Sequence, residues 1–227
     1  MFIPALAMDL REKVRQRRES EEVSALLPAA QAMLLGCLYD GWSSETTFTS
    51  NKIMGGFNYS RVTLSKVVDQ LQSLKLLKSV KSRGFTNLYA FDSNRSEIFG
   101  RARRYMRSPV RRKVAIDAKL QLGEGVFLAG ETALAKYTML AEPTKPIYGM
   151  TKKRFAELIA NEAFRTTESI DDTSAWVEIW AYKSLANNKN VADPASLLLS
   201  LEDNPDERVQ ICLDELKEQV VWLASED

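Results

Sequence analysis

Apolar residues recur at spacings of three and four between residues 60 and 74, which is the period of an amphipathic helix. One face of this helix, which we expect to pack inward, carries Leu64, Val67, Val68, Leu71 and Leu74. The opposite face carries Ser60, Arg61, Thr63, Lys66 and Gln70. The pattern therefore predicts one long helix, which begins at residue 59 or 60 and ends near residue 74.

Two shorter helices are expected before this one. A Thr-Ser pair at residues 49–50 can cap a short helix that carries Ile53 and Met54. The two glycines at residues 55–56 then allow a tight turn between packed helices. Residues 26–39 have apolar side chains at core spacing and predict a further helix, whose role is structural.

A β-hairpin is expected after the long helix. Residues 78–81 and 87–91 alternate in polarity, as strands with one buried face do. The segment between them contains a glycine and one basic residue, and a lysine precedes it at residue 81. We therefore expect two short strands joined by a basic tip.

The second half of the chain mixes helical and strand patterns. An apolar segment, residues 125–130, precedes a helix expected over residues 131–140, and another helix is expected to open at Thr151. Residues 176–182 alternate and predict a strand, with Trp176, Glu178, Trp180 and Tyr182 on one face. Two helices should close the chain, over residues 194–201 and from Pro205 after an Asn204 cap. We expect an α+β protein that is mainly helical.

These patterns divide the chain into four parts. We expect a charged N-terminal arm over residues 1–22, a helix-turn-helix domain over 23–98, a basic linker over 99–113 and an α+β domain over 114–227. Pro109 should end a helix that begins at Ser96 and should mark the domain boundary. Within this arm, residues 9–22 have Leu10 and Val14 as their only apolar pair, so a phosphate-contacting arm, a solvated face and a dimer strut remain open.

Charge is distributed unevenly, although the chain has 31 basic and 30 acidic residues. Residues 1–113 contain 20 Lys and Arg against 10 Asp and Glu, whereas residues 114–227 contain 11 against 20. Within residues 51–113 the numbers are 15 and 3. Such an excess of basic residues is typical of a surface that displaces counterions from nucleic-acid phosphates.

The order helix, turn, helix and basic hairpin resembles the winged helix-turn-helix of bacterial regulators such as the MarR-like family. The run Ser-Arg-x-Thr-Leu-Ser-Lys at residues 60–66 and the Leu-x-x-Leu-x-Leu-Leu run at residues 71–77 carry this resemblance. It covers about residues 28–92. The resemblance implies a double-stranded DNA-binding domain whose second helix faces the major groove. A winged helix that serves only as a protein scaffold is the alternative.

A second resemblance concerns the whole chain. An N-terminal winged helix, an Ala-Gly-x-x-Ala-Leu-Ala-x-Tyr run at residues 129–137 and an α+β C-terminal domain are similar to the antitoxin-repressors of abortive-infection type E systems. Those proteins repress their own operon and antagonise a toxin encoded beside it. The resemblance implies an autorepressor whose acidic C-terminal domain binds a toxin.

Candidate DNA-binding residues follow from the winged-helix hypothesis. Base edges would be contacted by Tyr59, Ser60, Arg61 and Thr63. Arg61 is the strongest candidate for specificity, because a guanidinium can pair bidentately with guanine. Phosphate or, at the hairpin tip, minor-groove contacts would come from Lys66, Lys78, Lys81 and Arg83. The basic linker adds Arg101, Arg104, Arg111 and Arg112. This linker could follow a phosphate backbone, serve as a solvated connector or form a surface for the acidic second half.

Catalysis and cofactor binding are not expected. The chain has no histidine, so it lacks the commonest general base and metal ligand. It also lacks the glycine-rich fingerprints of phosphate and dinucleotide sites. Cys37 and Cys212 each lie among apolar residues and should be buried and reduced. We expect no metal and no cofactor.

Together these features predict a cytoplasmic transcriptional repressor, which should form a homodimer because such regulators usually read two half-sites. No apolar run is long enough for a membrane helix, and the N-terminus lacks the basic region of a signal peptide. Two rival hypotheses remain. One is a winged-helix replication initiator, and the other is an interaction module that DNA binding merely tethers.

Overall fold

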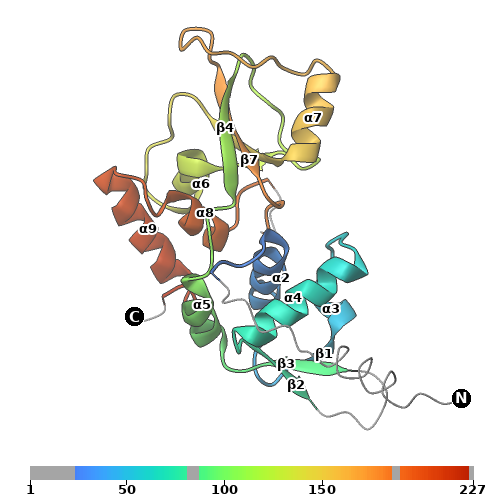
Figure 1. Cartoon of the computed structure of the whole chain (residues 1–227). Coiled ribbons are helices and arrows are strands. Elements are labelled where there is room, and N and C mark those ends of the chain that lie inside the picture. Colours follow the sequence, from blue (N-terminus) through green and yellow to red (C-terminus); the bar gives the residue numbers. More distant parts are fainter. Residues whose placement is uncertain (1–23, 81–86, 186–189, 225–227) are drawn as a thin grey trace, which may run out of the picture.

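Eight helices and two small sheets form from the part of the chain that the computed structural model describes, residues 24–80, 87–185 and 190–224. This is the α+β class that the sequence predicted. Two lobes are visible in Figure 1, the lower one from the N-terminal half and the upper one from the C-terminal half. The expected N-terminal arm, residues 1–22, lies outside the described residues.

The lower lobe contains four helices and a three-stranded antiparallel sheet. The helices are α2 (Pro28–Tyr39), α3 (Ser50–Met54), α4 (Arg61–Ser73) and α5 (Arg95–Arg103). The strands are β1 (Thr47–Thr49), β2 (Leu77–Val80) and β3 (Leu88–Phe91), in the order β1-β3-β2. The long helix and the hairpin strands therefore form where the polarity pattern predicted them, within one or two residues. The strand β1 was not predicted.

Capping and burial explain the limits of α4. The Ser60 hydroxyl accepts a hydrogen bond from the Thr63 backbone N–H, which begins the helix. Leu64, Val67, Val68 and Leu71 are buried against the lobe. After the helix, Lys75 has a φ of 56°, so the chain reverses there and Leu76 returns to the core. The predicted Thr49 cap of α3 is wrong in one respect, since Thr49 makes no side-chain capping bond.

The upper lobe is built on a four-stranded sheet with the order β4-β7-β6-β5. Its strands are β4 (Val110–Ile116), β5 (Phe127–Leu128), β6 (Ile147–Thr151) and β7 (Ala175–Trp180). The strands β6 and β7 are parallel, and the other pairs are antiparallel. The helices are α6 (Gly130–Tyr137), α7 (Lys152–Ala160), α8 (Pro194–Leu201) and α9 (Glu207–Gln219).

The strand β7 separates two hydrophobic clusters, as its alternating pattern predicted. Val177 and Ile179 point into a small cluster beneath α7, together with Phe164. Trp176 and Trp180 belong to the other cluster, on the side of α6 and α8. Glu178 shares that second face, is buried, and accepts a hydrogen bond from the Trp180 indole N–H at 3.1 Å.

The expected basic linker needs correction. Residues 99–113 comprise the second half of α5, a turn and the first four residues of β4. The helix α5 ends at Arg103, before the Ser108–Pro109 pair that was expected to end it. The cap of α9 also differs from the prediction: Asp206 accepts from the Arg208 backbone N–H, and Asn204 accepts from Asp206.

The larger hydrophobic cluster continues from one lobe into the other. Trp222, which follows α9, contacts Tyr39 of α2 and Phe99 of α5 at ring-centroid distances of 5.1 and 5.4 Å. The Tyr39 hydroxyl is 3.1 Å from the buried carboxylate of Asp193, the N-cap of α8. The two lobes therefore share a core, where the sequence had suggested two separate ones.

Candidate nucleic-acid interface

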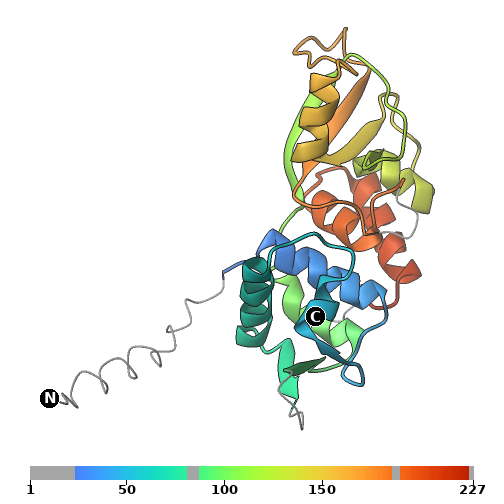
Figure 2. The same cartoon turned by 90° about the vertical axis from the view of Figure 1, so that its right-hand side faces the viewer.

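The helix α4 lies at the surface of the lower lobe, with its outer side free of other elements. It runs across the front of the lobe in Figure 1 and along its left-hand side in Figure 2. The side chains exposed on this outer side are Arg61, Val62, Ser65, Lys66 and Asp69. Among the described residues, neither Arg61 nor Lys66 has an ion-pair partner. Both cations are therefore available to a ligand.

The residues expected to read bases beside Arg61 are engaged within the protein. The hydroxyls of Ser60 and Thr63 lie 3.0 Å apart and hydrogen-bond to each other. Tyr59 is half-buried and its ring is stacked on Phe57, with centroids 5.7 Å apart. Burial raises the pKa of Tyr59, so its hydroxyl stays neutral. These three side chains shape the start of α4 and would need to rotate to reach a base.

Gln70, expected on the outer face, has a structural role instead. Its side-chain amide accepts from the Leu27 backbone N–H at 2.9 Å and donates to the Ala25 carbonyl at 3.0 Å. It thereby fixes the chain before α2 against α4. Sequence reasoning missed Val62 and Ser65, although both lie opposite the buried stripe of α4. Val62 is 67% exposed, so it offers a methyl surface beside Arg61.

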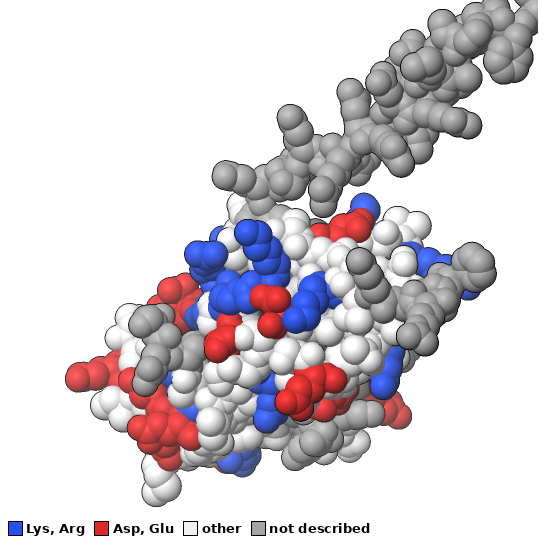
Figure 3. Space-filling view, turned by 90° about the horizontal axis from the view of Figure 1, so that it is seen from below, with Lys and Arg blue, Asp and Glu red and all other residues white. Residues whose placement is uncertain are grey.

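A second group of basic side chains surrounds Asp92 at the corner between β3 and α5. Arg101 approaches this carboxylate at 3.2 Å and Lys78 at 3.9 Å. Arg101 also donates to the carbonyl of Lys75. Seen from below, basic side chains gather on part of the lower face with acidic ones between and beside them (Figure 3). Lys78 and Arg101 are the two predicted phosphate contacts in this group. The charge of Arg101 is thus partly neutralised by the Asp92 carboxylate.

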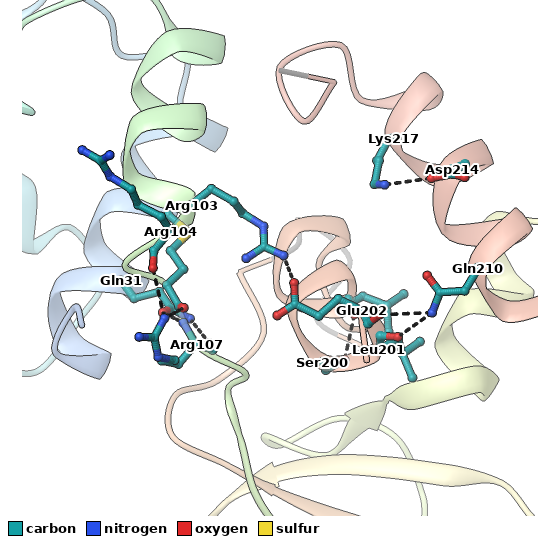
Figure 4. A network of polar contacts seen from close by, with 12 residues as sticks. Gln31, Arg103, Arg104, Arg107, Ser200, Leu201, Glu202, Gln210, Asp214 and Lys217 are labelled. Carbon is teal, nitrogen blue, oxygen red and sulfur yellow. Dashed lines mark hydrogen bonds and ion pairs between the residues drawn. The ribbon is translucent and has the colours of Figure 1, made fainter. Parts of the chain in front are cut away.

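A groove of about 550 Å³ lies at the junction between the lobes. Four arginines and two acidic residues line it: Arg103, Arg104, Arg107, Arg111, Glu202 and Asp203. Figure 4 shows Arg103 reaching from α5 to an ion pair with Glu202, at the end of α8. Burial lowers the pKa of Arg103, an effect that the neighbouring Asp203 opposes. The groove is therefore basic, but its charge is partly balanced by the upper lobe.

The other arginines near the lobe junction differ in how far their side chains are free to contact a ligand. Arg107 donates to three backbone carbonyls, including that of Ser24, and so holds the chain locally. Arg104 is exposed and lies 4.9 Å from the Tyr105 ring centroid. Arg111 and Arg112 are exposed at the start of the edge strand β4. Figure 2 shows α4 and β4 on the same, left-hand side of the molecule.

The predicted site residues thus fall into three places. Tyr59, Ser60, Arg61, Thr63 and Lys66 lie on α4 or just before it, Lys78 and Arg101 lie near Asp92, and Arg104, Arg111 and Arg112 lie near the lobe junction. Lys81 and Arg83, at the hairpin tip, lie outside the described residues. The groups are held by one shared core, so their relative positions are set by the fold.

We also searched the described residues for reactive cysteines, metal-binding groups and membrane-spanning helices. Cys37 and Cys212 are both buried and free, as predicted. Those ranges contain no group of three or more Cys, Asp and Glu side chains placed to hold a metal ion. None of the helices described is long and apolar enough to cross a membrane. No family model matches the chain, and no curated protein or solved structure matches it either.

Proposed function

We propose that this protein is a sequence-specific repressor that binds double-stranded DNA through a winged helix-turn-helix of the MarR-like kind. The supporting feature of the fold is the element order α2, β1, α3, α4, β2, β3, in which β1 pairs with β3. A winged helix has this order of helices and strands. In this arrangement α4 is the helix that enters the major groove, and the β2–β3 hairpin is the wing beside it.

One observation carries the proposal. The outer side of α4 has one exposed methyl surface and two cations without an ion-pair partner among the described residues, on a helix whose other side is buried. In a major groove, Arg61 can donate two hydrogen bonds to guanine, and Val62 can contact a thymine methyl. Lys66, one turn later, would contact phosphate. Such a face favours an anionic partner, and an exposed helix with basic side chains fits the groove of B-form DNA.

The exposed arginines of β4 extend this proposed surface beyond the winged helix. The strand β4 lies on the same side of the molecule as α4, so a duplex held by α4 would run towards it (Figure 2). Arg111 and Arg112 are exposed at its start. They would add phosphate contacts, which strengthen binding to every sequence equally. We also propose a homodimer on DNA that reads two half-sites about one helical turn apart, and repression of the protein's own promoter.

Fluorescence anisotropy with the full-length protein tests this function. Labelled duplexes containing its own upstream region and a random sequence of equal length are titrated across salt concentrations from about 50 to about 200 mM. The repressor hypothesis expects tight binding to the upstream region and much weaker binding to random DNA. Equal affinities with the same steep salt dependence would reject sequence-specific repression and leave an electrostatic tether. No binding to either duplex at low salt would reject DNA binding altogether.

A further inference from the structure

The upper lobe has an open groove of about 520 Å³ between α9 and the chain that follows α6. Leu140, Val209 and the buried Cys212 supply apolar lining. The edges are formed by residues 139–144 on one side and by the exposed side of α9 on the other. Gln219 of α9 donates to the Tyr137 carbonyl at 2.9 Å, which joins α9 to the end of α6, two residues before the other edge begins.

Two exposed large apolar side chains of the described residues line this same groove. Met139 is 93% exposed and Ile211 is 61% exposed, and they come from segments on opposite edges. Isolated exposed apolar residues are common on protein surfaces and need no explanation. Two that converge on one apolar groove from distant parts of the chain are typical of an interaction site.

The charge around the groove defines what can bind there. Four acidic residues line it: Glu131, Glu142, Asp206 and Glu215. The single basic lining residue, Arg208, is paired with Asp206 at 2.7 Å and is thereby neutralised. Lys136, beside the groove, pairs with Glu142. Glu131 and Glu215 have no cationic partner among the described residues, so the rim keeps an excess of negative charge.

We propose that this groove binds a cationic amphipathic helix from a partner protein. Apolar side chains on one stripe of that helix would cover Met139 and Ile211, and lysines or arginines beside the stripe would pair with Glu131 and Glu215. DNA is excluded as the occupant, because the acidic rim repels phosphate. In Figures 1 and 2 the helix α9 lies on the side of the molecule away from α4, so the groove and α4 can be occupied together.

The test uses the full-length protein and a fluorescein-labelled model peptide of about five helical turns, with leucine on one stripe and lysine elsewhere. Anisotropy should show saturable binding that weakens at high salt. Ile211→Glu should weaken it by about tenfold or more, because it places a charge in the apolar contact. Ile170→Glu is the matched control: Ile170 is 78% exposed but lies outside the groove, so its substitution should leave binding unchanged.

Several outcomes would overturn the proposal. One is equal binding of a peptide with the same composition but with its leucines scattered around the helix, since the acidic surface alone would then explain the affinity. Another is an equal loss in the two isoleucine variants. A solution mass of two chains that falls to one with Ile211→Glu would assign the groove to a second copy instead. DNA binding by Ile211→Glu should match the unaltered protein, so failure here is distinguishable from failure of the DNA proposal.

Discussion

At the scale of single residues, Arg61 and Lys66 differ in what they can recognise, although both extend from the same side of α4. A guanidinium that pairs with guanine distinguishes bases, whereas an ammonium near phosphate does not. We expect Arg61→Ala to cost about 1 to 3 kcal/mol on the specific site and little on random DNA. Lys66→Ala should weaken both and reduce the salt dependence by about one ion. Anisotropy titrations of both variants on both duplexes measure this difference.

The control for this pair is Lys153→Ala. Lys153 is exposed on α7, in the other lobe, so its substitution removes the same charge at a distance from α4. Its effect should be small on both duplexes. Equal losses for Arg61→Ala on specific and random DNA would contradict the assignment of Arg61 to base recognition and would make it one more phosphate contact.

The buried carboxyl of Glu178 should make the free energy of unfolding depend on pH. Burial in β7 raises the pKa of Glu178 above its ordinary value near 4.5, and the hydrogen bond from Trp180 opposes this only in part. The folded protein therefore binds this proton more tightly than the unfolded chain does. Between the ordinary pKa and the raised one, the free energy of unfolding should fall as pH rises and recover on acidification.

Glu178→Gln tests that effect, because glutamine keeps the shape and can still accept from the Trp180 indole. Urea unfolding should show a higher free energy of unfolding at pH 7 and a shallower decline with pH. Some decline should remain, since burial also raises the pKa of Asp193. An unchanged pH dependence in this variant would show that the pKa of Glu178 is the same in the folded and unfolded chain, and would contradict the prediction.

At the scale of elements, the pairing of β5 with β6 depends on one glycine. Phe127 of β5 lies directly over Gly149 of β6, and a Cβ at Gly149 would overlap the Phe127 ring. That ring cannot easily move, because it is buried and packs edge-on against Trp180 with centroids 5.0 Å apart. We expect Gly149→Ala to cost about 1 to 3 kcal/mol in urea unfolding, as overpacking of a core does.

Gly56→Ala is the matched control for this substitution. A Cβ at Gly56 would meet nothing within 4 Å, and the backbone there does not need a positive φ. The control should change the free energy of unfolding by well under 1 kcal/mol. If both alanine variants were equally stable, the close approach of Phe127 to Gly149 would not be a constraint on the sheet.

The elements that the sequence predicted are those with a local polarity pattern. The helix α4 has a buried stripe at helical spacing, and β7 has alternating faces, so both could be recognised from neighbouring residues. The strand β4 could not be recognised in this way, because its partner strand β7 is distant in the sequence. In the register of these two strands, Lys113 lies opposite Glu178. The Arg-Arg-Lys sequence of β4 was instead interpreted as part of a basic linker. The strand β6 is buried along its length and shows no alternation.

The sequence also predicted part of the candidate site. Helical periodicity placed Arg61 and Lys66 on the outer side of α4, and the structure places both there. Periodicity alone could not show that Thr63 hydrogen-bonds to Ser60, or that Gln70 holds the chain before α2. The second of these contacts joins residues that are 43 positions apart in the sequence. Non-local contacts of this kind decide which polar side chains remain free for a ligand.

At the scale of the whole molecule, the acidic upper lobe reaches the basic lower lobe at the arginine groove. Glu202 pairs with Arg103 (Figure 4). Asp203 lines the same groove as Arg104 and Arg111. These two acids reduce the positive potential that a duplex on α4 would meet near the junction. The charge difference between the halves is thus partly balanced where the lobes meet.

Replacing both acids, as Glu202→Gln with Asp203→Asn, should therefore strengthen binding to random DNA several-fold at low salt. Because Arg103 then becomes available to phosphate, the salt dependence should steepen by about one ion. The affinity for the upstream sequence should increase by no more than the affinity for random DNA does. The ratio of the two affinities should therefore fall or stay unchanged. Anisotropy across a salt series measures these quantities, and urea unfolding checks that loss of the ion pair leaves the fold intact.

Glu168→Gln with Asp171→Asn is the matched control, since it changes the net charge equally at exposed positions before β7. Screening should confine the effect of those distant charges to a small change, because the Debye length is only about 8 Å at physiological ionic strength. If both double variants strengthened DNA binding equally, net charge alone would be responsible. If only the pair at the groove did so, the upper lobe would limit non-specific binding through its contact with Arg103.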